Sequence, residues 1–208
     1  MYFDKDRNWH KTEVIEMKKN RNFLWMNLVL VIALIVGIAF PTVNAEAKSK
    51  KKKVLVVYFS ATGTTKSAAK KLKKATGGRL YQIKAADPYT SADIDYSREN
   101  CRAVTEQRDG TVRPEIKGKV KNIRKHDVIF VGYPIWGGKA PMIIQTFLES
   151  YNLKGKKIVP FCTSGGSGIS GSMKGIKASA KGAKVVKGKD LTDLSGKSIE
   201  KWAKQEIK

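Results

Sequence analysis

The chain has 208 residues and a net charge of +23, from 41 lysines and arginines against 18 aspartates and glutamates. These basic residues are scattered along the chain instead of being clustered with aromatic stacking positions, which argues against a specific nucleic-acid partner. The two histidines and two cysteines form no metal-ligand pattern and no Ser-His-Asp arrangement, so neither kind of site is indicated.

The first 47 residues are predicted to be a signal peptide or an N-terminal membrane anchor. Residues 23–40 form an uncharged apolar run of 18 residues with basic residues before it. Val43 and Ala45 occupy the −3 and −1 positions of a cleavage site, which is typical of a secretory signal peptide. An uncleaved anchor stays open, because 18 residues also reach the lower limit for a membrane span. Either way, we expect an exported protein, secreted or held in the cell envelope.

A basic linker, residues 48–53, leads into a domain that comprises residues 54–208. Strands are predicted near 54–59, 79–84, 127–132, 157–162 and 184–187, and helices near 65–76, 117–125, 140–150, 171–181 and 195–206. This alternation predicts an α/β fold, with a doubly wound parallel sheet and helices on both faces. The long connection after the second strand is expected to form its own loop with a short helix near 96–108.

A hydroxyl-rich turn, Ser60-Ala61-Thr62-Gly63-Thr64-Thr65, joins the first predicted strand to the first predicted helix. A strand, a tight turn and a helix N-terminus make an anion site, because free backbone N–H groups and the helix dipole both favour negative charge. The turn contains no lysine and no GxxxxGK[ST] pattern, so it is not the phosphate loop of a nucleoside-triphosphate enzyme. A phosphate monoester suits it better.

Two more glycine- or hydroxyl-rich loops follow later strands of the predicted sheet. After the third strand come Pro134, Ile135, Trp136, Gly137 and Gly138, and after the fourth come Thr163, Ser164, Gly165, Gly166 and Gly168. In open α/β sheets, ligands bind beyond the carboxyl ends of the strands. The three loops together are what one cofactor with a phosphate, a ribityl chain and a planar ring would need.

These loops resemble those of the flavodoxin family. Its phosphate loop reads [ST]-x-T-G-x-T, which Ser60, Thr62, Gly63 and Thr65 match, and the other two loops are similar to the PIWWG and TSGGSG loops of a bacterial branch. The resemblance implies a flavodoxin-like five-stranded sheet in the order 2-1-3-4-5 and FMN as the cofactor. It also implies that residues 60–65 bind the phosphate and that residues 134–138 and 163–168 surround the flavin ring.

The second loop of the site carries one expected aromatic contact. Trp136 would lie at an exposed loop tip and stack on the flavin, with Gly137 and Gly138 leaving the backbone free to approach the ring. The related pattern has a second tryptophan where this chain has Gly137, so a second aromatic wall would come from Tyr89 or Tyr96. A disulfide between Cys101 and Cys162 stays open.

The resemblance favours an exported FMN-binding protein that carries one or two electrons. An FMN-dependent NAD(P)H:quinone-type oxidoreductase is one alternative, and a flavin-free basic adhesion domain is another. From Lys48 onward the net charge is +22, whereas cytoplasmic flavodoxins are usually acidic. This charge suits adhesion to anionic cell-wall polymers or to a membrane surface, and a basic surface that only keeps the protein soluble stays open as the alternative. The redox partner is not predicted.

Overall fold

The computed structural model describes residues 51–208, so the predicted signal peptide or anchor lies outside the described residues. Within residues 51–208, no helix is long and apolar enough to cross a membrane. This part of the chain is one compact unit.

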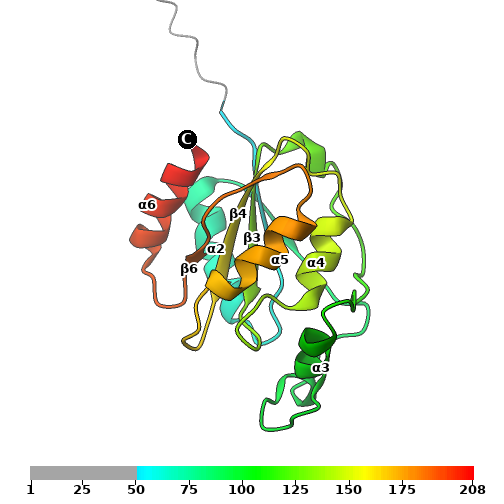
Figure 1. Cartoon of the computed structure of the whole chain (residues 1–208). Coiled ribbons are helices and arrows are strands. Elements are labelled where there is room, and N and C mark those ends of the chain that lie inside the picture. Colours follow the sequence, from blue (N-terminus) through cyan, green and yellow to red (C-terminus); the bar gives the residue numbers. More distant parts are fainter. Residues whose placement is uncertain (1–50) are drawn as a thin grey trace, which may run out of the picture. The chain divides into compact units, whose positions relative to one another are not determined.

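A parallel sheet forms the centre of this unit (Figure 1). Its strands are β1 (Val54–Tyr58), β2 (Arg79–Gln82), β3 (Val128–Pro134), β4 (Lys157–Thr163), β5 (Lys184–Val185) and β6 (Lys189–Asp190). The order is β2-β1-β3-β4-β5, and β6 continues the outer edge by pairing with β4. The predicted fold class, a flavodoxin-like parallel sheet in the order 2-1-3-4-5, is therefore confirmed.

Helices cover both faces of the sheet. The α-helices are α2 (Thr64–Thr76), α3 (Arg102–Asp109), α4 (Met142–Glu149), α5 (Met173–Ser179) and α6 (Gly196–Ile207). Helices α2 and α6 pack side by side on one face, while α4 and α5 pack together on the other (Figure 1). Short 3₁₀ turns at Ala92–Ile94, Ile123–Lys125 and Ser170–Ser172 complete the connections.

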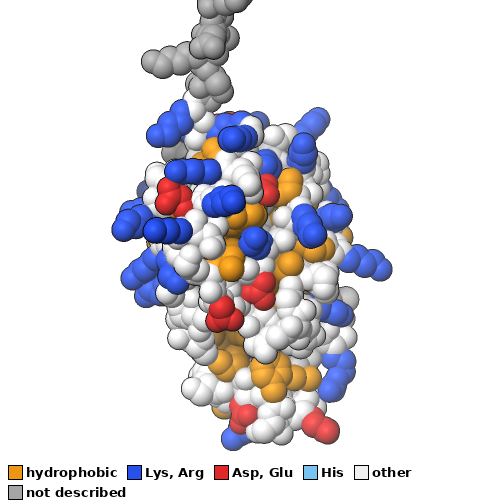
Figure 2. Space-filling view, turned by 90° about the vertical axis from the view of Figure 1, so that its left-hand side faces the viewer, with side chains coloured by type: hydrophobic (Ala, Val, Ile, Leu, Met, Phe, Trp, Pro, Cys, Tyr) orange, Lys and Arg blue, Asp and Glu red, His pale blue; other side chains and the backbone are white. Residues whose placement is uncertain are grey.

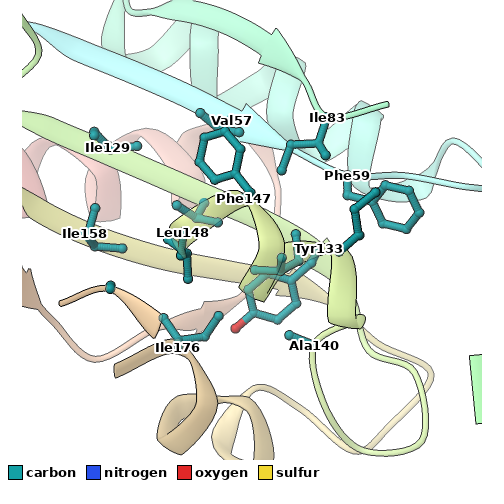
Figure 3. Packing of buried hydrophobic residues seen from close by; sticks show 14 of the residues in the cluster. Val57, Phe59, Ile83, Ile129, Tyr133, Ala140, Phe147, Leu148, Ile158 and Ile176 are labelled. Atoms are coloured by element: carbon teal, nitrogen blue, oxygen red, sulfur yellow. The ribbon is translucent and has the colours of Figure 1, made fainter. Parts of the chain in front are cut away.

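The sheet is buried on both sides because β1, β3 and most of β4 consist of apolar residues. Leu72 of α2 and Ile199 of α6 pack against one face, in a core that includes Phe130 and Phe161. On the other face, Phe147, Leu148 and Ile176 pack against Ile129 and Ile158, as Figure 3 shows. Strands that are apolar on both faces are typical of a parallel sheet covered by helices.

The helix predicted over residues 117–125 is wrong. Gly118 has a φ of 83° and Asn122 a φ of 61°, and neither left-handed conformation can continue a right-handed helix. Only the 3₁₀ turn at Ile123–Lys125 forms, directly before β3. The strand predicted near 184–187 ends at Val185, and no sequence pattern indicated β6.

The two cysteines are free thiols, each buried in the core. Burial raises the pKa of the Cys162 thiol, and the nearby Asp190 raises it further. Among the described residues, no group of His, Cys, Asp and Glu side chains could hold a metal ion.

An ion pair closes the long connection onto α4. The Arg113 guanidinium donates to both carboxylate oxygens of Glu149, at 2.7 and 3.1 Å, and also to the carbonyls of Gly110, Thr111 and Val112. The hydrogen bond from Arg113 lowers the pKa of Glu149, and a bond from the Ser179 hydroxyl lowers it less.

Arg113→Gln is expected to reduce the free energy of unfolding at neutral pH only slightly, by less than about 1 kcal/mol, because both side chains are partly exposed. A carboxylate with a lowered pKa stabilises the fold above its ordinary pKa, and this contribution disappears as the pH falls through the folded pKa. The variant and the wild type should therefore differ at neutral pH and converge once the pH has fallen below the folded pKa of Glu149 in denaturant titrations. Lys204→Gln, which breaks the exposed pair with Glu200, is the control and should change less. A difference that persists in acid would contradict this account.

Candidate functional site

The phosphate-type turn lies at the carboxyl end of β1 and leads directly into α2. Gly63, the residue before α2, has a left-handed φ of 97°, which a residue with a side chain adopts only with strain. The Ser60 hydroxyl accepts from the Gly63 N–H at 3.1 Å and so fixes the turn. The Thr62 and Thr64 hydroxyls are exposed and lie 3.5 Å apart on its outer side.

Four backbone N–H groups in this turn, those of Ala61, Thr62, Thr64 and Thr65, have no acceptor among the described residues. A Cβ added at Gly63 would meet no atom within 4 Å, so the mouth of the turn is open. The first turn of α2 contains no acidic residue, and Lys66 is exposed there. Free donors, an open mouth and a helix N-terminus of positive character make this turn suitable for a phosphate.

Thr65 does not lie at the open mouth. Its side chain is buried, and its hydroxyl shares a hydrogen bond of 2.7 Å with the buried Thr163 hydroxyl at the end of β4. This bond joins the first loop of the site to the third. The resemblance implies that Thr65 binds the phosphate with the rest of residues 60–65, whereas its hydroxyl holds the two loops together in the structure.

Thr65→Val should therefore destabilise the fold by about 1–3 kcal/mol, because the buried Thr163 hydroxyl loses its partner. The double variant Thr65→Val, Thr163→Val removes both hydroxyls and should recover most of this loss in thermal or denaturant unfolding. A single variant of unchanged stability that binds phosphate-bearing flavin less well would instead place the hydroxyl on the phosphate.

The second loop is a tight turn that follows β3. Pro134 ends the strand, and the Ile135 N–H donates to the Thr163 carbonyl at 2.8 Å. Trp136 and Lys139 exchange two backbone hydrogen bonds of 2.9 Å across Gly137 and Gly138. Both glycines have positive φ values, 51° and 80°, which such a two-residue turn requires. A Cβ on either glycine would meet open space, so the backbone of the turn is accessible.

Trp136 is not at an exposed tip, so that part of the prediction is wrong. Its side chain is only 5% exposed. Tyr89 covers it with ring centroids 4.9 Å apart, and Phe59 does so at 5.4 Å, both edge to face. Gly137 and Gly138 turn the backbone outward, but the indole turns inward under the long connection.

The long connection brings both expected tyrosines to this loop. Tyr89 contacts Trp136, and its hydroxyl donates to the buried Glu106 carboxylate at 2.6 Å. Arg102 pairs with Glu106 at 2.7 Å and places its guanidinium 4.0 Å from the centre of the Tyr89 ring. Burial and the bond to Glu106 raise the pKa of Tyr89. This cluster holds Tyr89 against Trp136.

Tyr96 is the large hydrophobic residue with the greatest exposure in residues 51–208, at 49%. Burial of its hydroxyl raises its pKa to about 12, against a smaller opposite effect of a bond with the Gly137 backbone. The tyrosine ring therefore stands beside the glycine turn with much of its surface free.

The third loop is held by Ser164 and by two residues that the sequence did not single out, Asp190 and Thr192. The Ser164 hydroxyl accepts from the N–H groups of Gly166 and Gly168, at 3.0 and 3.1 Å. The Ser164 N–H donates to the Thr192 hydroxyl at 2.9 Å, and Asp190 of β6 accepts from the Thr192 N–H. The spacing Asp-x-Thr is typical of such a side-chain-capped turn, and this signal could have identified Asp190 and Thr192.

Two cavities lie at the loops. One of about 350 Å³ is lined by Phe59, Ser60, Ala61 and Tyr89, together with the end of β2. Another of about 490 Å³ lies between Ser164–Gly166 and residues 190–194. A cavity of about 600 Å³ between α4 and α5 is larger, but only Lys139 and Ala140 connect it to the loops. The loop chemistry, and not cavity size, identifies the site.

The fold and these loops define an α/β protein with a candidate ligand site at the carboxyl ends of β1, β3 and β4, whose first loop is suited to an anion. The flavodoxin family model matches residues 53–206, and the chain belongs to this family. No protein of curated function matches the chain.

Several solved structures are similar to this part of the chain. A provisionally assigned flavoprotein from Bacteroides eggerthii DSM 20697 is 47% identical, with a TM-score of 0.72, over 76% of this chain and 99% of its own. A second one, from Bacteroides uniformis ATCC 8492, is 41% identical, with a TM-score of 0.70, over 74% and 99%. A flavoprotein from Lactobacillus acidophilus NCFM, solved in complex with FMN, is 24% identical, with a TM-score of 0.57, over 73% and 99%, and shares the fold.

Proposed function

We propose that residues 54–208 bind FMN and that the protein transfers one or two electrons. The observation that carries this proposal is the group of four unpartnered N–H groups around Gly63, at the open N-terminus of α2. They supply donors for one phosphate dianion, the terminal group of FMN. Membership of the flavodoxin family and the FMN complex of the Lactobacillus relative support the choice of cofactor.

The residues present fit the other parts of this cofactor. Gly137 and Gly138 offer exposed backbone, and Ser164 to Gly168 form a turn whose glycines face open space. Tyr96 offers an exposed aromatic face beside the glycine turn, whereas contact with Trp136 requires Tyr89 to move. When bound, the flavin supplies the redox chemistry, and the protein holds it and keeps water from one side.

Titration of flavin-free protein with FMN, FAD and riboflavin tests this proposal. Quenching of flavin fluorescence should show the tightest binding for FMN, because the turn provides for one terminal phosphate. FAD binding as tight as FMN binding would contradict the assignment, since FAD carries a pyrophosphate and no free terminal phosphate.

We also propose that the protein is exported. The support is the sequence of residues 23–45, with its basic flank, apolar run and small residues at a cleavage position. Cell fractionation with N-terminal sequencing should recover protein that begins at Glu46 or Lys48 outside the cytoplasm. Full-length protein in the membrane fraction would favour the anchor, and protein in the cytosol would overturn export.

A further inference from the structure

Basic and acidic residues are distributed unequally between the two ends of the described domain. We call the end of the domain at the carboxyl ends of the strands the flavin end. Residues 85–115, which are part of the long connection between β2 and β3 at this end, contain seven acidic residues, four arginines and no lysine. The other 127 described residues contain 29 basic and six acidic residues, a net charge of +23. Figure 2 shows lysine and arginine crowded toward the end where the chain enters the domain and sparse at the opposite end.

Part of this basic charge lies on the loops that precede the strands. Lys52 precedes β1, Lys125 precedes β3, Lys154 precedes β4, and Lys181 precedes β5; all four side chains are exposed. Because the strands are parallel, their amino ends all lie at the same end of the sheet. We call this surface the basic end and define it by these four lysines.

Hydrogen bonds confirm that these loops are neighbours. The Gly155 N–H donates to the Gly182 carbonyl at 3.0 Å, which joins the loop of Lys154 to that of Lys181. The Lys156 ammonium donates to the Arg124 carbonyl at 2.6 Å, which joins the Lys154 loop to the Lys125 turn. The basic end is therefore one continuous surface.

The acidic residues nearest to the basic end already have partners. Asp127 accepts from the Lys53 N–H at 2.8 Å, and Glu206 pairs with Lys157 at 3.0 Å. Neither carboxylate pairs with Lys52, Lys125, Lys154 or Lys181 within residues 51–208. The Lys125, Lys154 and Lys181 ammonium groups thus face solvent without an ion pair in residues 51–208, whereas the Lys52 ammonium donates to the oxygen of the terminal residue Lys208 at 2.6 Å.

We propose that the basic end docks on an anionic lipid bilayer, so that the flavin end points away from the membrane. Lysines on several separate loops suit a broad layer of anionic headgroups better than one small ligand. Nucleic acid is disfavoured, because the most exposed large aromatic of the described residues, Tyr96, lies at the other end. The chain also leaves the basic end at Lys51, only eleven positions after the apolar run that ends at Phe40.

This orientation would leave the flavin end of the docked protein accessible from solution. The open phosphate turn, the glycine turn and the acidic connection all follow the carboxyl ends of the strands, opposite to the basic end. A soluble redox partner could therefore reach the flavin while the protein stays on the membrane. Only this last step rests on the proposed FMN binding; the docking itself does not.

Binding of residues 51–208 to vesicles tests the docking. The Bacteroides eggerthii relative matches this chain over 99% of its own length, and residues 51–208 form one compact unit, which supports the use of this domain alone. The wild type should sediment with vesicles that contain phosphatidylglycerol but not with pure phosphatidylcholine vesicles, and added salt should release it.

Two variants of equal net charge locate the docking face. The edge variant replaces Lys52, Lys125, Lys154 and Lys181 with Gln, and the control variant replaces the exposed Lys84, Lys117, Lys189 and Lys197, which lie toward the flavin end. Each lysine near an anionic membrane raises the affinity about fivefold. The edge variant should therefore bind the anionic vesicles at least about 50-fold more weakly than the wild type, and the control variant no more than about fivefold more weakly. FMN titration of the edge variant should match the wild type and shows that it is folded.

Hydrogen exchange on vesicles gives the orientation directly. Bound wild type should be protected in the loops before β3 and β4 and unprotected in residues 85–115. Equal losses for both variants, or protection of residues 85–115, would overturn the proposal. If soluble polyglycerol phosphate binds the domain more tightly than the vesicles do, the partner is a wall polymer and not the membrane. This result would also overturn the proposal.

Discussion

The double variant Thr62→Ala, Thr64→Ala is expected to bind FMN about 10²- to 10⁴-fold more weakly than the wild type, while riboflavin binding changes little. The two hydroxyls are exposed on the outer side of the phosphate turn, 3.5 Å apart. Each hydrogen bond to a charged group contributes about 1.5–3 kcal/mol, and riboflavin has no phosphate to accept one. Paired titrations with the two flavins measure the difference.

Ser67→Ala is the matched control for this pair. Ser67 is exposed on the next turn of α2, so its hydroxyl should not affect either flavin. Equal weakening of FMN and riboflavin in the double variant would mean that the turn does not bind the phosphate. Loss of FMN binding in the control would mean that α2 had shifted as a whole.

Gly132→Ala is expected to destabilise the domain by about 3 kcal/mol or more. Gly132 lies in the buried centre of β3, opposite Phe161 in the register with β4. A Cβ there would overlap three atoms of the Phe161 ring, which is itself fully buried. Denaturant unfolding of the purified variant measures the loss.

A second substitution shows whether the ring is the cause. Phe161→Leu removes the overlapping ring atoms at a cost of its own of about 1–3 kcal/mol. The double variant Gly132→Ala, Phe161→Leu should be more stable than Gly132→Ala alone, which is a favourable coupling between neighbours. Simple addition of the two losses would contradict the overlap.

The central strands could be predicted well from the sequence because their apolar runs are compatible with few structures other than a buried strand. The apolar runs that became β1, β3 and β4 are long enough and uniform enough to be buried on both faces. Near the edge the signal weakened: β6 is the two residues Lys189–Asp190, which pair with β4 although neither is apolar. The helix expected over residues 117–125 does not form because Gly118 and Asn122, two residues that tolerate left-handed φ values, adopt them.

The site loops were predicted from local patterns, and their errors came from contacts between distant segments. The position of the phosphate turn follows from the strand and helix on either side of it. The bond from Thr65 to Thr163 joins residues 98 positions apart, and no local pattern predicts it. Trp136 is covered by Tyr89, from a connection in which the partly exposed Arg102 pairs with the buried Glu106. Such burial is decided only when the connection folds over the loop.

The identity of the ligand released from the native protein tests the central claim most directly. Protein purified without added flavin should be yellow, and heat or acid should release a molecule with the flavin absorption spectrum and the mass of FMN, one for each chain. Release of FAD or riboflavin, or a colourless protein that takes up no added FMN, would contradict the account of the phosphate turn.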